Sequence, residues 1–180
     1  MLFRSRFGLR VRYSPETTIL DTGGGIKQAE PLLAGEPFVV INGDSVLEAS
    51  FRDLVEFHRD RGGVATMALR ADPDAVRYGL VEIDGDARVR RIVGRPETTD
   101  ATGLRGLMFP GLHVLEPEVF RYMDAGAAVS VTRTTYPAMI ARGVPIYGWE
   151  TTARWINIDT PESVAAADRE LRTRPVQASG

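Results

Sequence analysis

Short apolar runs alternate along this chain with segments of helical spacing. Residues 37–41 read Pro-Phe-Val-Val-Ile, a continuous β-branched run that is typical of a parallel strand covered on both faces. Residues 65–70 and 144–150 follow as further strands. We therefore predict that residues 37–41 form a central strand of a sheet.

Other segments have the spacing or the boundary residues of helices. Residues 26–33 are apolar at helical intervals, and Ser50 can cap a helix over residues 51–61 that Gly62 and Gly63 end. Pro161 fits the first turn of a helix over residues 162–172. Helices are also predicted over residues 117–123 and 134–142.

The remaining apolar pattern alternates with a period of two. Residues 8–13 predict a half-exposed strand, and residues 78–84 and 89–93 flank the Gly85-Asp86 turn as a hairpin at the edge of the sheet. Residues 107–115 predict one more strand, with Pro110 early in it. Because strands alternate with helices, the chain is expected to be an α/β domain with a largely parallel sheet.

Composition narrows the class of function. The 180 residues are 43% hydrophobic and 26% charged, which is typical of one globular domain. A net charge of −2 gives no basic face for nucleic acid, and no apolar run is long enough for a membrane span. The absence of cysteine excludes disulfides and thiolate sites, so we expect a cytoplasmic protein without nucleic-acid or membrane partners.

The most informative motif is Asn42-Gly43-Asp44, which directly follows the predicted strand over residues 37–41. Ligands of open α/β sheets bind at the carboxyl ends of the strands. Mg²⁺ takes oxygen ligands and needs only one or two protein carboxylates, so Asp44 is a candidate metal ligand. Asp44 could equally cap the turn that follows the strand, and the tripeptide alone leaves both readings open.

Two further motifs are weaker alone. Thr22-Gly23-Gly24-Gly25 opens a helix, where free backbone N–H groups could approach a nucleotide, although a flexible turn has the same sequence. Residues 155–161, Trp-Ile-Asn-Ile-Asp-Thr-Pro, place Asn157 and Asp159 before a helix. Taken alone, Asp159 is better explained as the N-cap of that helix.

Together, these motifs resemble the sugar-1-phosphate nucleotidyltransferase family, which includes mannose-1-phosphate guanylyltransferases. The resemblance covers nearly the whole chain, and its order and spacing are specific. It implies a Rossmann-like mixed, mostly parallel sheet with helices on both faces, the nucleotide-diphospho-sugar transferase fold. The matching segments are 13–16, 22–25, 38–44, 78–81, 111–115 and 155–161.

The resemblance also implies roles for individual residues. Asp44 would bind the catalytic Mg²⁺. Glu16, Gly23 and Gly24 would contact the base of the nucleotide, and Gly79 and Gly111 would contact the sugar. Arg95, in Gly94-Arg95-Pro96, stands where the family has the Lys of a Glu-Lys-Pro stretch and would meet the sugar phosphate, while Gly94 replaces the carboxylate.

The second metal position departs from the family. Asn157 stands where the family has an Asp, and an amide offers an oxygen ligand without the charge. Asp159, where the family usually has Gly, is an alternative ligand.

The family's Gly-rich loop with Thr-Arg, followed by Pro-Lys-Pro, does not occur in these residues. That loop holds the triphosphate and stabilises charge on the α-phosphate. We therefore expect an N-terminally truncated domain over residues 1–173, with its first strand absent, and a flexible tail over residues 174–180. The loss of that strand would leave open sheet edges, which predicts poor stability or self-association into a homo-oligomer.

The resemblance implies the formation of an NDP-sugar and pyrophosphate from an NTP and a sugar 1-phosphate, with Mg²⁺. The preferred pair is GTP and mannose 1-phosphate, and the truncated chain alone is expected to be inactive. One alternative is a uridylyltransferase acting on an amino-sugar or muramate 1-phosphate, and another is a non-catalytic sugar-nucleotide-binding or regulatory homologue. A generic dinucleotide binder is disfavoured, because Gly23–Gly25 lacks the Gly-x-Gly-x-x-Gly spacing.

Overall fold

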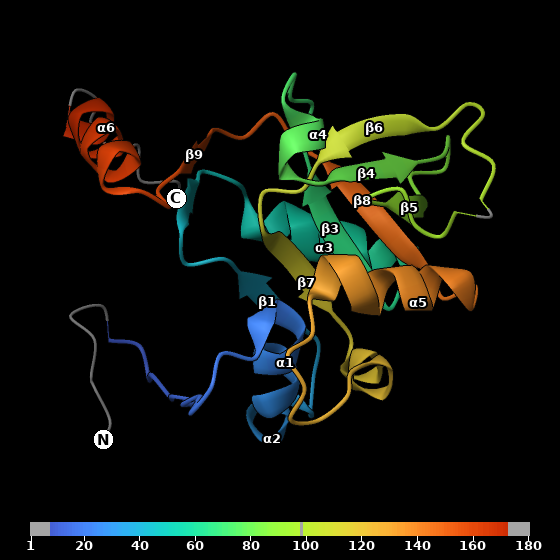
Figure 1. The fold of residues 1–180 in the computed structure, drawn as a ribbon, viewed down its shortest axis with the longest axis horizontal. Coiled ribbons are helices and arrows are strands. Elements are labelled where there is room, and N and C mark those ends of the chain that lie inside the picture. The colour runs from blue at the N-terminus through green and yellow to red at the C-terminus, as the bar shows by residue number, and fades with distance from the viewer. Residues whose placement is uncertain (1–7, 98, 173–180) are drawn as a thin grey trace.

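The computed structural model describes residues 8–97 and 99–172. Its main sheet has the strand order β1 (Phe38–Ile41), β7 (Leu112–Leu115), β3 (Ala65–Leu69) and β8 (Ile146–Glu150). Strands β3 and β8 are parallel, whereas β7 is antiparallel to both β1 and β3 (Figure 1). The sheet is therefore mixed, as the resemblance implies. The predicted tail over residues 174–180 lies outside the described residues.

Strand β3 is the centre of the sheet, because all five of its residues are buried. Met67 and Leu69 pack into one hydrophobic cluster, and Ala68 packs into another on the opposite face. Helix α5 (Tyr136–Ala141) contributes to the first cluster and helix α3 (Phe51–Arg61) to the second. Helices thus cover both faces of the sheet, as expected. Each buried large apolar side chain contributes about 1.5–3 kcal/mol.

Helix α3 has the predicted bounds and the predicted boundary chemistry. The Ser50 hydroxyl accepts a hydrogen bond from the Asp53 amide at 3.3 Å, and Gly62 ends the helix with a φ of +63°. His58 is buried and lies 2.8 Å from the Thr66 hydroxyl through Nδ1. This histidine is therefore part of the packing between α3 and the sheet.

A second sheet has three strands in the order β5 (Val89–Ile92), β4 (Leu80–Ile83) and β6 (Arg105–Met108). The predicted hairpin of β4 and β5 is confirmed, but it belongs to this second sheet and not to the edge of the main sheet. The strand predicted over residues 107–115 is instead two strands, β6 and β7, that belong to different sheets. Pro110 lies between them, where its missing N–H and fixed φ favour a break.

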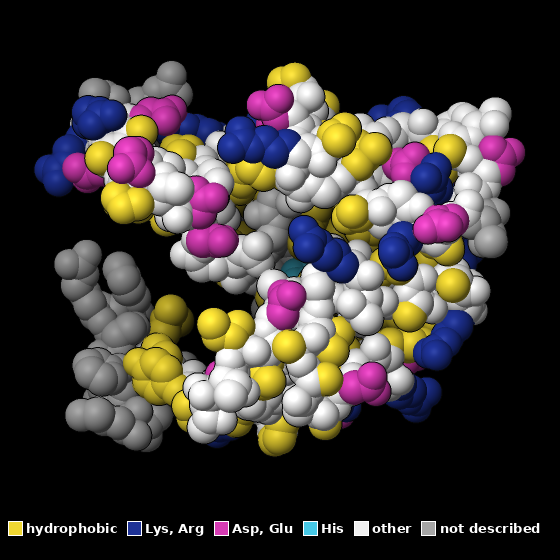
Figure 2. Space-filling view, viewed as in Figure 1, with side chains coloured by type: hydrophobic (Ala, Val, Ile, Leu, Met, Phe, Trp, Pro, Cys, Tyr) yellow, Lys and Arg dark blue, Asp and Glu magenta, His cyan; other side chains and the backbone are white. Residues whose placement is uncertain are grey.

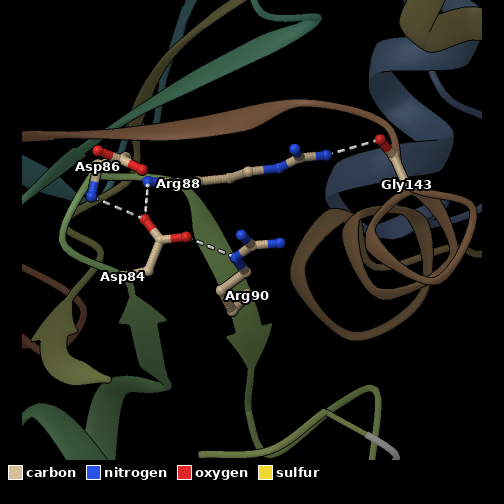
Figure 3. A network of polar contacts seen from close by, with 5 residues as sticks. All are labelled: Asp84, Asp86, Arg88, Arg90 and Gly143. Atoms are coloured by element: carbon tan, nitrogen blue, oxygen red, sulfur yellow. Dashed lines mark hydrogen bonds and ion pairs between the residues drawn. The ribbon is translucent and has the colours of Figure 1, made fainter. Parts of the chain in front are cut away.

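Polar contacts attach the tip of the β4–β5 hairpin to the loop before β8 (Figure 3). The Asp84 carboxylate accepts hydrogen bonds from the amides of Asp86 and Arg88 at 3.0 Å and from Arg90 Nε at 2.6 Å. Arg88 Nη2 donates to the Gly143 carbonyl at 2.7 Å. Burial tends to raise the pKa of Asp84, but these hydrogen bonds hold that pKa below its usual value.

The other elements lie outside these two sheets. They are helices α1 (Asp21–Gln28), α2 (Glu30–Leu33), α4 (Ala75–Tyr78) and α6 (Pro161–Arg172), a 3₁₀ helix (Pro117–Tyr122), a π-helical turn (Val131–Thr135), and strands β2 (Ser45–Leu47) and β9 (Trp155–Asn157). None of the helices in the described part of the chain is long and apolar enough to cross a bilayer.

Three further local predictions are wrong. Within residues 8–13, only Arg10 forms an isolated bridge and there is no strand. Strand β1 is not central: it pairs with β7 alone among the described strands, and Val39 and Ile41 are 40% and 45% exposed. The predicted helix over residues 26–33 is two helices, of which α1 begins at Asp21. Apolar character predicts local conformation, whereas neighbours in a sheet depend on the rest of the chain.

Candidate functional site

The Asn42-Gly43-Asp44 turn meets Gly111 at the carboxyl end of β1. The backbone N–H of Asn42 donates a hydrogen bond to the Gly111 carbonyl at 2.9 Å. Gly111 has a φ of +89°, and a Cβ there would lie 2.5 Å from Asn42 Cγ, so only glycine fits. Gly111 therefore packs against the first residue of the turn that ends at Asp44.

The same turn runs into β2, which pairs with β9. Ser45 lies opposite Asn157, and the Ile158 amide donates to the Asp44 carbonyl at 2.9 Å. The backbones of Asp44 and of residues 157–159 are therefore neighbours. Asp159 is exposed and does not cap α6, contrary to the simpler reading of its sequence context. Thr160 and Ser163 cap the helix through reciprocal amide-to-hydroxyl bonds of 3.1 and 3.0 Å.

The side chains at this edge suit a hard cation. Asp44 and Asp159 carry carboxylates, Asn157 carries an amide oxygen, and the Ser45 hydroxyl is buried without a hydrogen-bond partner among the described residues. Oxygen ligands of this kind are those that Mg²⁺ prefers. Within residues 8–97 and 99–172, however, no three His, Cys, Asp or Glu side chains are grouped closely enough to hold a metal by themselves. A bound Mg²⁺ would therefore depend on water and substrate oxygens for its other ligands.

The glycines at the start of α1 are packed rather than open. The amides of Gly23 and Gly24 donate to the Val129 carbonyl at 2.7 and 3.1 Å. A Cβ on Gly24 would lie 2.4 Å from the Ala127 carbonyl oxygen. The expectation that these N–H groups are free to face a nucleotide is wrong in this structure, because the segment over residues 127–131 uses them.

Glu16 lies beside a different glycine. Its Oε2 accepts from the Leu20 amide at 2.9 Å, and its Oε1 lies 2.7 Å from the position that a Cβ on Gly25 would take. The carboxylate is exposed. Of the three residues predicted to contact the base, Glu16 is therefore the one whose polar group is accessible. The glycine beside its carboxylate is Gly25, not Gly23 or Gly24.

A surface hollow of about 180 Å³ lies between α4, the end of β5 and the π-helical turn. Its lining includes Gly79, which the resemblance assigns to the sugar, together with Arg77, Tyr78, Val93, Phe109 and Arg133. Figure 2 shows basic side chains beside the depression at the centre of this face. Arg95 is exposed on the turn that follows β5 and is not among the lining residues.

An aromatic contact connects the hollow with the Asp44 edge. The ring of Trp155, on β9, meets the ring of Tyr78 edge-on with centroids 5.0 Å apart. Asn157 is two residues further along β9, which corresponds to roughly 7 Å. The residues predicted to contact the sugar and those predicted to hold the metal therefore belong to segments that lie next to one another in the fold.

A buried histidine supports the hollow from below. His113 on β7 meets the Phe109 ring edge-on, and its Nδ1 is hydrogen-bonded to the Tyr136 hydroxyl. Burial lowers the pKa of His113 to about 3 and raises the pKa of Tyr136 above its usual value. His113 is therefore neutral near pH 7 and positions Phe109, and it has no role as a nucleophile.

The sequence did not point to Arg77, Val93, Phe109 or Arg133 as site residues. They come from separate segments that the fold brings to one hollow. Arg77 directly precedes the Tyr78-Gly79 pair, and that proximity was the one available signal. Val93 has a φ of +52°, which no pattern of apolar residues indicates.

The comparisons with known proteins agree with this arrangement. The family model described as nucleotidyl transferase matches residues 2–174. A mannose-1-phosphate guanylyltransferase of Mycobacterium tuberculosis is 30% identical over 93% of this chain and 46% of that protein. A UTP–glucose-1-phosphate uridylyltransferase of Synechocystis is 24% identical over 96% of this chain and 47% of that protein. The chain thus spans about half the length of the curated relatives it matches.

Solved structures share the fold. HddC from Yersinia pseudotuberculosis, complexed with GMP-PN, is 25% identical with a TM-score of 0.68, covering 86% of this chain and 64% of that one. A putative glucose-1-phosphate thymidylyltransferase from Bacillus anthracis, at 20% identity, has a TM-score of 0.74 over 94% of this chain and 68% of that one. With the family model extending over nearly all its residues, the chain belongs to the sugar-1-phosphate nucleotidyltransferase family.

Proposed function

We propose that this chain carries the sugar-phosphate side and the metal-binding edge of an enzyme that forms an NDP-sugar and pyrophosphate from an NTP and a sugar 1-phosphate. The observation that supports it most is the meeting of Asp44, Gly111 and residues 157–159 at the carboxyl end of β1, next to the hollow that contains Gly79. GTP and mannose 1-phosphate are the preferred pair, in line with the relative of highest identity among those described above.

In the proposed reaction, an oxygen of the sugar phosphate attacks the α-phosphorus of the NTP in line with the leaving pyrophosphate. One P–O bond forms and the bond to the β-phosphate oxygen breaks. Mg²⁺, which Asp44 with Asn157 or Asp159 would hold, supplies charge neutralisation at the phosphates. This chain's own contribution is to bind and orient the sugar phosphate beside Asp44.

The 180 residues contain no Gly-rich loop with Thr-Arg and Pro-Lys-Pro, which would bind the triphosphate. We therefore propose that these residues alone bind sugar nucleotides but are inactive in turnover. A non-catalytic binding role is the second candidate, and Asn157 favours it, because an uncharged ligand at the second metal position weakens Mg²⁺ binding.

The test combines turnover and binding on the same sample. GTP and UTP are each paired with mannose 1-phosphate, glucose 1-phosphate and N-acetylmuramate 1-phosphate, and NDP-sugar and pyrophosphate are quantified by chromatography. Binding of GDP-mannose is titrated with and without Mg²⁺. The proposal predicts Mg²⁺-dependent binding that Asp44→Asn removes and Asp53→Asn, on the exposed face of α3, retains. Binding that is independent of both Mg²⁺ and Asp44 would contradict it.

A further inference from the structure

The charged residues that line the hollow are all positive. Two of its lining residues are Arg77, at the end of α4, and Arg133, in the π-helical turn. Among the described residues that line it, none is Asp or Glu. The two guanidinium groups come from segments far apart in the sequence, so the fold itself brings both cations to one small depression.

Neither cation is neutralised within the described chain. Other arginines form ion pairs, such as Arg91 with Glu82 at 3.4 Å and Arg90 with Asp84 at 2.6 Å. Arg77 instead lies over the Tyr78 ring, with its Cζ 5.6 Å from the centroid. Arg133 forms no side-chain hydrogen bond or ion pair with the residues that the structure describes.

Arg77 and Arg133 are both exposed and line the same hollow, so an anion bound in the hollow would be attracted by both positive charges. Guanidinium groups bind phosphate and carboxylate through parallel N–H donors, and the charge assistance makes such bonds stronger than neutral ones. We propose that Arg77 and Arg133 form an anion-binding pair that receives a phosphate or carboxylate group of the sugar substrate. The apolar walls of Val93 and Phe109 would then face the sugar ring.

This inference deepens the proposed function and rests on it, because it assigns specific residues to the charge of the sugar substrate. It also differs from the sequence expectation, in which Arg95 alone meets the sugar phosphate. Arg95 lies on the neighbouring turn and outside the lining of the hollow. Arg77 and Arg133 are thus additional positioning and specificity residues.

The experiment measures binding to the full 180-residue chain. The variants are Arg77→Gln, Arg133→Gln and the double variant, with Arg52→Gln as the control. Arg52 is an exposed arginine on α3 without an ion pair to any described residue, so its substitution makes the same change in net charge. Mannose, mannose 1-phosphate, glucuronate and inorganic phosphate are titrated by calorimetry or NMR without Mg²⁺, and circular dichroism checks the fold.

We expect each single variant to raise the Kd of the anionic ligand about tenfold, with the Kd of mannose unchanged. A loss confined to mannose 1-phosphate and inorganic phosphate assigns the pair to a phosphate, and a loss confined to glucuronate assigns it to a carboxylate. Equal losses in Arg52→Gln, unchanged Kd values, or no saturable anion binding by the wild type would overturn the inference. If anion binding follows the expected pattern but GDP-mannose shows no Mg²⁺-dependent binding, the result contradicts the proposed function and not the anion-binding pair.

Discussion

The glycine segment of α1 and the hollow around Gly79 use the same residue type in opposite ways. At Gly23 and Gly24, the absence of a side chain lets the segment over residues 127–131 come into contact with the helix. The backbone N–H groups of both glycines donate hydrogen bonds to that segment. At Gly79, the backbone borders an open hollow that also contains two unpaired arginines. A glycine therefore indicates a binding site only when its surroundings leave the backbone accessible, and hydrogen-bond partners distinguish the two cases.

The largest expected effect tests the close packing of the α1 glycines. Gly24→Ala places a methyl group 2.4 Å from a backbone carbonyl oxygen, which cannot move away cheaply. We expect a loss of about 3 kcal/mol in the free energy of unfolding and a fall of about 10 °C in Tm. Gly35→Ala is the control, since nothing lies within 4 Å of its Cβ position. Equal Tm values for the two variants would show that the α1 contact is loose.

The next effect concerns the buried support of the hollow. Because burial holds the pKa of His113 at about 3, the unfolded chain binds a proton below about pH 6.5 and the folded chain does not. Stability should therefore fall with decreasing pH, by about 1.4 kcal/mol per pH unit below 6.5 and down towards pH 3. Urea unfolding between pH 7 and 4.5 measures this slope. His113→Gln should flatten it, and an unchanged slope would show that other groups cause the acid sensitivity.

A smaller effect is expected at the rim of the hollow. Val93 and Gly94 form a two-residue turn with positive φ values of 52° and 73°, which suits Asn-Gly and strains a β-branched residue. Val93→Asn should raise the free energy of unfolding by about 1 kcal/mol, as measured by chemical denaturation. Val76→Asn, at an exposed helical position of the same hollow, should give no gain. If both variants lose stability, the packing of Val93 outweighs its backbone strain.

The smallest expected effect separates Gly25 from its two neighbours. A Cβ on Gly25 would meet only the flexible end of the Glu16 side chain. The gain in helix propensity offsets the displacement of that carboxylate, so the stability of Gly25→Ala should stay within about 0.5 kcal/mol of the wild type. If Glu16 binds the nucleotide base, as the resemblance implies, the Kd of GDP-mannose should nevertheless rise. If Gly25→Ala loses as much stability as Gly24→Ala, Gly25 is packed against its neighbours as tightly as Gly24 is.

Local elements were predictable wherever the signal was local. Helix α3 begins after the Ser50 cap and ends at Gly62, and the β4–β5 hairpin encloses the predicted turn, because caps and turns depend on adjacent residues. The central position of β1 was predicted wrongly, since β3 is the strand buried on both faces. A hydrophobic run therefore predicted that residues 38–41 form a strand, but it identified neither the burial of that strand nor its neighbours.

The candidate site divides in the same way. The Asn42-Gly43-Asp44 motif made Asp44 a candidate metal ligand, because a carboxylate at the end of a strand carries its chemistry in its type and local position. The resemblance to the family implied the roles of Gly79, Gly111 and Asn157, and all four assignments stay predictions. Tertiary structure alone decided that the amides of Gly23 and Gly24 are occupied by Val129, and that Arg77 and Arg133 share a hollow. The physical reason is that occupied donors and converging charges depend on distances between segments far apart in the chain, which local pattern does not encode.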